Sequence, residues 1–165
     1  MIKEVRVEPL IGEVFAPYGD VLEPGNKSPD QDYAIYKYWD KIAKLSFSND
    51  PTELGYLRVF RRPFNFDKME RHNKASQSFI PVTRSSSFIA VAKGKQDEQQ
   101  TLPDLNTLKA FILDGTKGIN LYPGTWHWSI FPIDESADYI MVVRRDTIVD
   151  DQEIVSLGTT IELKL

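Results

Sequence analysis

Apolar and polar positions alternate in short runs along most of the chain, a pattern typical of β-strands with one buried face. Valine, isoleucine and aromatic residues are frequent in these runs, as they are in strands generally. The pattern predicts about eleven strands. They are expected at Lys3–Glu8, Tyr33–Trp39, Leu54–Arg62, Lys68–His72, Gln77–Val82, Ser87–Lys93, Leu108–Leu113, Gly118–Tyr122, Thr125–Phe131, Tyr139–Arg144 and Thr159–Leu165.

The segments between these runs are short or contain residues that tolerate turn geometry. A hairpin tip is expected at Lys93–Glu98, where polar and charged residues follow one another. Helical patterns are confined to single turns at Gly12–Tyr18 and Asn49–Leu54. Strands without crossover helices predict antiparallel sheets that form a sandwich or a barrel. We expect one all-β domain over residues 1–165, with only minor short helices.

Composition narrows the classes of function. The formal net charge of -4 and the pI near 5.2 argue against a nucleic-acid-binding protein, which requires a basic face. The N-terminal residues lack the apolar core of a signal peptide, and apolar runs such as Phe88–Ala92 are too short to cross a membrane. We therefore expect a cytoplasmic protein with no nucleic-acid or membrane partner.

The chain has no cysteine and only two histidines, His72 and His127, so any metal ligands must be imidazole nitrogens or carboxylate and amide oxygens. Side chains alternate between the two faces of a strand. Glu70 and His72 therefore share one face, and Arg71 lies on the other.

The same reasoning applies to two other runs. It groups His127 with Thr125 and Ser129, against Trp126 and Trp128. It also groups Arg61 with the apolar Leu57 and Val59, so we expect the Arg61 side chain to point inward.

The spacing Glu70-x-His72-x4-Gln77, followed by Pro123-Gly124-Thr125-Trp126-His127, resembles the two motifs of cupins. Cupin motifs read His-x-His-x4-Glu and Pro-x-Gly-x2-His. Their four ligands come from facing strands and bind one divalent metal inside a small barrel. The resemblance implies a metal set of Glu70, His72, Gln77 and His127, in which Gln77 brings no charge.

Longer sequence segments narrow the resemblance to one family. Met69-Glu70-Arg71-His72, Ser76–Pro81, Pro103–Ile112 and Pro123–His127 follow one another in an order similar to that of the ureidoglycolate lyase family, also called ureidoglycolate hydrolase. Tyr18-Gly19-Asp20-Val21 matches as well, so the similarity covers almost the whole chain. The family usually has a second histidine where this chain has Trp128, and Pro-Leu-Gly where it has Asn73-Lys74-Ala75.

The resemblance implies a homodimeric, cupin-like antiparallel β-barrel (double-stranded β-helix). It implies an enzyme of the carbon–nitrogen lyase type that splits ureidoglycolate into glyoxylate and urea, in allantoin degradation and purine metabolism. A divalent metal such as nickel, manganese or zinc is an expected cofactor, although the chemistry is also open to an enzyme without metal.

The reaction suggests a role for each candidate residue. A base must take the hydroxyl proton of the carbinolamine, and His127 or His72 suits this near neutral pH. Glu70 would orient an imidazole or bind the metal. Two further residues are expected to bind the substrate. Arg61 would bind its carboxylate, and Gln77 would bind its ureido group. Weaker candidates for substrate binding are Arg71 and Lys93.

Two alternatives remain open from the sequence. One is a cupin enzyme that acts on another small carboxylate or sugar, with Trp128 as its marker. The other is a cupin-like small-molecule-binding module without turnover, which the uncharged Gln77 favours. Release of urea from ureidoglycolate separates the first interpretation from both.

Overall fold

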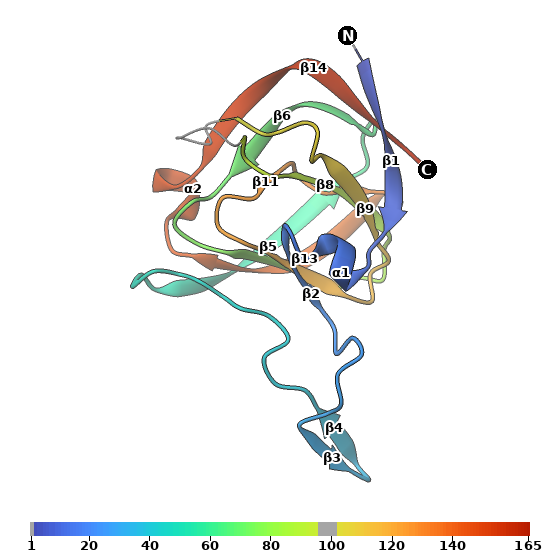
Figure 1. Cartoon of the computed structure of the whole chain (residues 1–165), viewed down its shortest axis with the longest axis vertical. Coiled ribbons are helices and arrows are strands. Elements are labelled where there is room, and N and C mark those ends of the chain that lie inside the picture. The colour runs from blue at the N-terminus through green and yellow to red at the C-terminus, as the bar shows by residue number, and fades with distance from the viewer. Residues whose placement is uncertain (1, 96–101) are drawn as a thin grey trace.

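The computed structural model describes residues 2–95 and 102–165 (Figure 1). The regular secondary structure of the described part is almost entirely strand, with two helices of one turn each. The strands are β1 (Ile2–Pro9), β2 (Gly19–Leu22), β3 (Gln31–Tyr33), β4 (Tyr36–Tyr38), β5 (Thr52–Phe60), β6 (Asn65–Arg71), β7 (Gln77–Pro81), β8 (Ser87–Ala92), β9 (Lys109–Leu113), β10 (Gly118–Leu121), β11 (Trp126–His127), β12 (Phe131–Pro132), β13 (Ser136–Arg144) and β14 (Glu153–Lys164). The helices are α1 (Gly12–Phe15) and α2 (Thr147–Asp150).

The strands form a closed ring and a second sheet that packs on it. The first sheet has the order β11-β6-β14-β1-β9-β8-β12, and an additional pairing of β11 with β8 closes six of its strands into a barrel. The second sheet has the order β2-β10-β7-β13-β5. The predicted all-β, cupin-like barrel is confirmed.

Two hydrophobic cores result from this arrangement. One lies within the ring and contains Met69, Phe88, Trp126 and Phe131. The other lies between the ring and the second sheet, and Phe79, Ile89, Phe111 and Tyr139 are among its members. Strand β8 contributes alternate residues to the two cores, which explains why all six of its residues are buried.

Several predicted elements differ in the structure. Strand β1 pairs in parallel with both β14 and β9, so the expectation of purely antiparallel sheets was wrong for this strand. The single strand expected over Tyr33–Trp39 is instead half of a hairpin, β3–β4. The helical turn expected at Asn49–Leu54 is absent, and β5 begins at Thr52. Residues 96–98 of the predicted Lys93–Glu98 tip lie outside the described residues.

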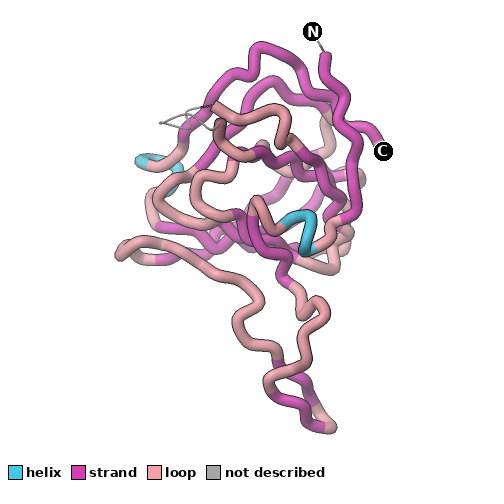
Figure 2. Tube along the Cα trace, in the orientation of Figure 1, coloured by secondary structure: helices cyan, strands magenta, loops and turns pink. Residues whose placement is uncertain are grey.

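The β3–β4 hairpin stands at the end of a long arm that extends away from the barrel (Figures 1 and 2). Its two strands pair only with each other in the sheets of the described chain. The root of the arm is tied to the outer face of the second sheet. There the buried Asn120 donates to the carbonyl of Lys44 at 3.1 Å and to Asp20 at 3.1 Å. The Tyr122 hydroxyl also donates to Asp20, at 2.6 Å, and burial together with this carboxylate raises the pKa of Tyr122 to about 12.

Gly19, at the start of β2, allows the close approach of β2 to β10. A Cβ added at Gly19 would lie 2.0 Å from the backbone oxygen of Asn120, which cannot move without breaking the sheet. We expect Gly19→Ala to lower the free energy of unfolding by about 1–3 kcal/mol, the cost of overpacking. Denaturant unfolding measures this cost. Gly12→Ala is the matched control, because a Cβ there meets nothing within 4 Å. Equal stability of the two variants would contradict the steric argument.

Among the described residues, no helix combines the length and the apolar character needed to cross a membrane.

Candidate functional site

The two histidines and Glu70 converge between the ring and the second sheet. Glu70 on β6 and His127 on β11 are directly opposite each other in the antiparallel pairing. His72 follows β6 immediately, and its ring centroid lies 5.6 Å from that of His127. One potential ligand atom from each of these three residues lies within 4.8 Å of the others.

Each imidazole presents its Nε2 atom to the site. His72 Nδ1 lies 3.1 Å from the carbonyl of Asp151, and His127 Nδ1 lies 3.0 Å from the carbonyl of Thr125. A carbonyl only accepts, so both Nδ1 atoms carry the proton and both Nε2 atoms keep a lone pair. This is the arrangement found in metal-ligating histidines, whose second nitrogen donates to an outer group.

Gln77, the first residue of β7, completes the group. Its Nε2 donates to His72 Nε2 at 3.5 Å, while its Oε1 is buried without a hydrogen-bond partner. His127 Nε2 is likewise without a hydrogen-bond partner, although Glu70 Oε1 lies 3.6 Å away. A buried polar atom left unpaired costs about 1–3 kcal/mol, so these atoms point to a ligand.

Burial lowers the pKa of His127, and the nearby Glu70 carboxylate opposes this effect only in part. His127 is therefore neutral at pH 7, with a free lone pair directed at the site. A neutral imidazole of this kind can accept a proton or bind a metal.

The four residues line a cavity of about 170 Å³. This is smaller than the roughly 300–1,000 Å³ of sites for drug-sized ligands, so the cavity suits a small metabolite. Its remaining walls are mostly apolar. They are formed by Leu57, Phe79, Ser129, Met141, Ile148 and Gln152.

The other predicted substrate-binding residues are not brought to this cavity. Arg61 is exposed, so the expectation that it points inward was wrong. The strand alternation holds for Leu57 and Val59, but β5 ends at Phe60, and the Arg61 side chain beyond it is exposed.

Arg71 and Lys93 also lie elsewhere. Arg71 is on the opposite face of β6, as the alternation predicted, where it pairs with Glu153 at 2.7 Å and stacks on Trp126. Lys93 is exposed and lines a separate surface depression beside Tyr122 and Pro123.

Ile148 and Gln152 are among the cavity residues that the sequence analysis missed. Both lie in or just after α2, a segment whose sequence carries no motif. Gln152 Nε2 donates to Glu70 Oε2 at 2.5 Å. Only the folded chain brings this segment to the end of β6.

Comparison with known proteins decides the family. The family model described as ureidoglycolate lyase matches residues 2–164. The chain belongs to the ureidoglycolate lyase family. The predicted resemblance is thereby confirmed, and the chain is an enzyme of the lyase class.

Individual family members are moderately similar to this chain. The ureidoglycolate lyase of Burkholderia mallei (strain NCTC 10229) is 29% identical over 149 residues, which cover 87% of this chain and 84% of the relative. That of Escherichia coli O1:K1 / APEC is 30% identical over 145 residues, with coverages of 86% and 88%. Among solved structures, a dTDP sugar isomerase from Desulfovibrio desulfuricans G20 matches with a TM-score of 0.45 and 16% identity, over 64% of each chain.

Trp128, which stands where the family usually has a second histidine, lies outside the cavity. Trp128 packs against the core inside the ring, on the side of β11 away from the cavity. The side chain at this position therefore does not line the histidine cavity, and the replacement of the usual family histidine leaves the four converging residues unchanged.

Proposed function

We propose that this protein cleaves ureidoglycolate to glyoxylate and urea in the cavity lined by Glu70, His72, Gln77 and His127. One observation carries the proposal. The only two histidines of the sequence meet in this small cavity with both Nε2 lone pairs directed into it. Family membership supplies the reaction, and the convergence supplies the groups for it.

His127 is the acid–base group in this proposal. Ureidoglycolate carries a hydroxyl, a carboxylate and a ureido nitrogen on one carbon. The neutral imidazole takes the hydroxyl proton, the oxygen electrons form the carbonyl of glyoxylate, and the carbon–nitrogen bond breaks. The imidazolium returns the same proton to the departing nitrogen, so urea leaves neutral. Glu70, at 3.6 Å, stabilises the imidazolium while it exists.

The remaining residues fit a divalent metal. Glu70, His72 and Gln77 would hold it, because they offer one carboxylate oxygen, one imidazole nitrogen and the unpaired Oε1 of Gln77. Nickel, manganese and zinc all accept such a mixed set. When bound, the metal supplies positive charge at the substrate carboxylate.

That charge matters because none of the described residues lining the cavity is a lysine or an arginine. Glu70 is itself an anion, and a second carboxylate close to it would be repelled. Gln77 and Gln152 offer amide groups that match the ureido end of the substrate. With the metal bound, the substrate carboxylate would face the metal, and its ureido group would face the amide N–H groups of Gln77 and Gln152.

Release of urea and glyoxylate from ureidoglycolate tests the proposal directly. Chelator-treated protein is assayed alone and after addition of nickel, manganese or zinc. We expect turnover, with the metal-loaded protein the more active. No turnover under any of these conditions would overturn the proposed reaction and favour a binding module or another substrate.

We also propose that the enzyme works as a homodimer, formed through the outer face of the second sheet. Lys44 and Ser46 of the arm root cover β10 and β7 on this side. The rest of the face carries the Arg58–Asp138 ion pair and, around it, exposed apolar side chains. We call these apolar side chains the outer patch, and it consists of Leu54, Tyr56, Phe60, Ile80 and Val82, which are 38–74% exposed.

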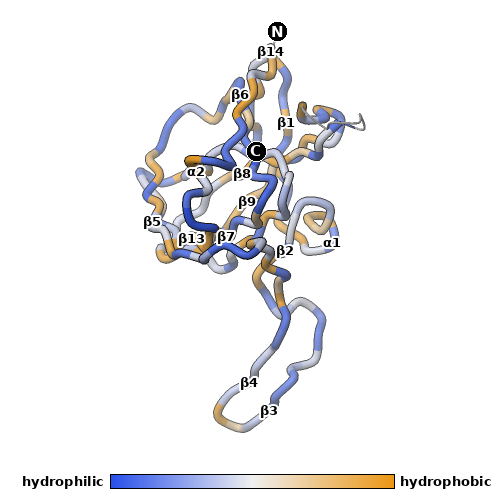
Figure 3. Tube along the Cα trace, turned by 90° about the vertical axis from the view of Figure 1, so that its left-hand side faces the viewer, coloured by the Kyte–Doolittle hydropathy of each residue, from blue (hydrophilic) through white to orange (hydrophobic). Residues whose placement is uncertain are grey.

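The arm supplies a second exposed apolar surface. Its hairpin exposes Tyr33, Ile35, Tyr36 and Tyr38, and its tip is hydrophobic (Figure 3). A two-stranded hairpin is marginally stable alone in water. In a two-fold dimer each arm would cover the outer patch of the other copy, so the apolar residues of both the arm and the patch would be buried.

A charge in the outer patch is expected to separate the subunits. Phe60→Asp would place a carboxylate in the buried interface and shift the mass measured by sedimentation from dimer to monomer. Ile2→Asp is the control, since Ile2 is equally exposed, at 65%, but lies on β1 outside the patch. Unchanged dimers in Phe60→Asp would exclude this face.

Three further expectations complete the proposal. The chain forms one domain over residues 1–165, which the sharing of β8 between both cores supports. We also propose that the enzyme works in the cytoplasm. Its reaction would serve allantoin degradation, where ureidoglycolate arises.

A further inference from the structure

The segment between β13 and β14 contacts the end of β6 at two successive residues. Asp151 accepts hydrogen bonds from the backbone N–H groups of Asn73, at 2.8 Å, and Lys74, at 2.9 Å. The backbone carbonyl of Asp151 accepts from His72 Nδ1 at 3.1 Å. One residue thus fixes both the backbone after His72 and the imidazole itself.

The next residue, Gln152, orients the neighbouring candidate ligand, Glu70. Gln152 Nε2 donates to Glu70 Oε2 at 2.5 Å, which leaves Glu70 Oε1 directed toward His127. Glu70 and His72 are therefore both oriented from outside the cavity by two adjacent residues.

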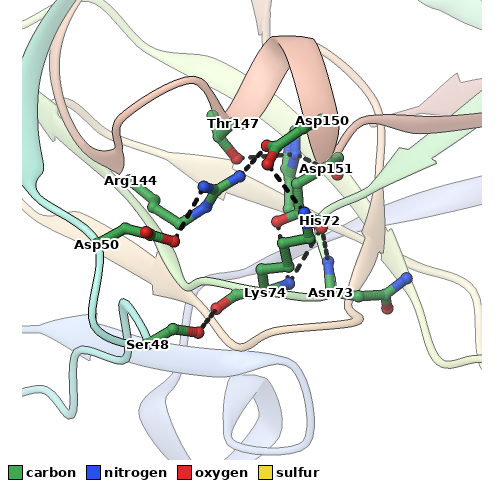
Figure 4. A network of polar contacts seen from close by, with 9 residues as sticks. All are labelled: Ser48, Asp50, His72, Asn73, Lys74, Arg144, Thr147, Asp150 and Asp151. Carbon is green, nitrogen blue, oxygen red and sulfur yellow. Dashed lines mark hydrogen bonds and ion pairs between the residues drawn. The ribbon is translucent and has the colours of Figure 1, made fainter.

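The segment is itself held in place by a charged network (Figure 4). The buried Arg144 pairs with Asp50, at 3.1 Å, and with Asp150. Lys74 reaches the same Asp150 at 2.9 Å, and the Ser48 hydroxyl donates to the carbonyl of Lys74 at 2.9 Å. These contacts join α2, the loop after His72 and the return segment of the arm, so the carbonyl of Asp151 is held firmly against the His72 ring.

We propose that Asp151 is a positioning residue that keeps His72 in the tautomer with its Nε2 lone pair directed into the cavity. The hydrogen bond at one ring nitrogen determines which nitrogen is free. Asp151→Ala keeps this carbonyl but loses the carboxylate that ties the segment to the backbone after His72, so the carbonyl is no longer held against Nδ1. A share of the neutral His72 then carries its proton on Nε2. The catalytic meaning of this role rests on the proposed function, but the tautomer itself does not.

Nitrogen NMR of the imidazoles tests the proposal on the full-length, chelator-treated protein. The chain has only two histidines, and the tautomer of His127 depends on Thr125, so His127 is an internal reference. We expect both rings to be Nδ1-protonated in the wild type. In Asp151→Ala the His72 signals should move toward the Nε2-protonated form, while those of His127 stay in place. Val149→Ala is the matched control, because Val149 lies on α2, just before Asp151, with 79% exposure.

Asp151→Asn covers the case in which the alanine variant does not fold. Its side chain keeps one oxygen for one of the two backbone N–H groups, so an intermediate shift is expected. Zinc affinity of both variants should fall about 10–100-fold, as when other outer-shell partners of metal ligands are lost. An unchanged His72 tautomer in a folded Asp151 variant would overturn the proposal. Correct tautomer shifts in a protein without lyase activity would instead refute only the proposed function.

Discussion

His127→Ala is expected to lower the turnover of ureidoglycolate by about 10²–10⁴-fold, the usual contribution of a positioned acid–base group. The physical reason is the state of this imidazole. Burial keeps it neutral, Thr125 fixes its Nδ1 proton, and its Nε2 has no hydrogen-bond partner. The only other histidine of the sequence, His72, belongs to the proposed metal set, so it is not expected to replace His127 as the base.

The loss should appear in kcat more than in KM, because the proton transfers occur in the transition state. Folding is expected to be retained, since Trp126 and Ile130 still anchor the strand region in the two cores. Ser129→Ala, which also changes the cavity wall, is the control and should keep most of the activity. Turnover unchanged in His127→Ala would remove this residue from the mechanism. A parallel fall in metal affinity would make it a metal ligand rather than the base.

His72→Ala is expected to weaken divalent metal binding by more than about 100-fold. Loss of an outer-shell partner alone costs about 10–100-fold, and loss of a ligand costs more. The variant removes the one nitrogen of the proposed set of Glu70, His72 and Gln77. Calorimetric titration of chelator-treated protein with nickel, manganese and zinc measures the effect. KM for ureidoglycolate should rise with it, because the cavity then lacks positive charge for the substrate carboxylate.

Gln77→Glu is the reverse test of the same site. It restores the carboxylate of the cupin motif, so metal binding is expected to be tighter than in the wild type. If His72→Ala and Gln77→Glu both bound metal with wild-type affinity, the metal site would lie elsewhere, and these residues would serve the substrate alone.

The sequence by itself determined the fold class and the chemistry of the cavity. Strand alternation separated Glu70 and His72 from Arg71, and His127 from Trp126 and Trp128, because successive side chains of a strand must point to opposite faces. The two motifs around these residues also predicted the family. The assignment of side chains to faces depends only on local strand geometry, which the linear chain contains, whereas the family came from the resemblance of the motifs.

Tertiary structure decided what that local geometry leaves open. Arg61 continues the alternation of Leu57 and Val59 in sequence, but β5 ends before it, so its side chain is exposed. Strand ends depend on the partner strand, here β13, and cannot be seen in the alternation alone.

The same holds for the residues that hold the site together. Asp151 and Gln152 are about eighty positions from His72 and Glu70 in the chain, and no motif marks them. They reach the site because β14 pairs with β6, which places the end of α2 beside the end of β6. Pattern predicts the face on which a side chain lies, whereas long-range strand pairing decides which distant residues meet it.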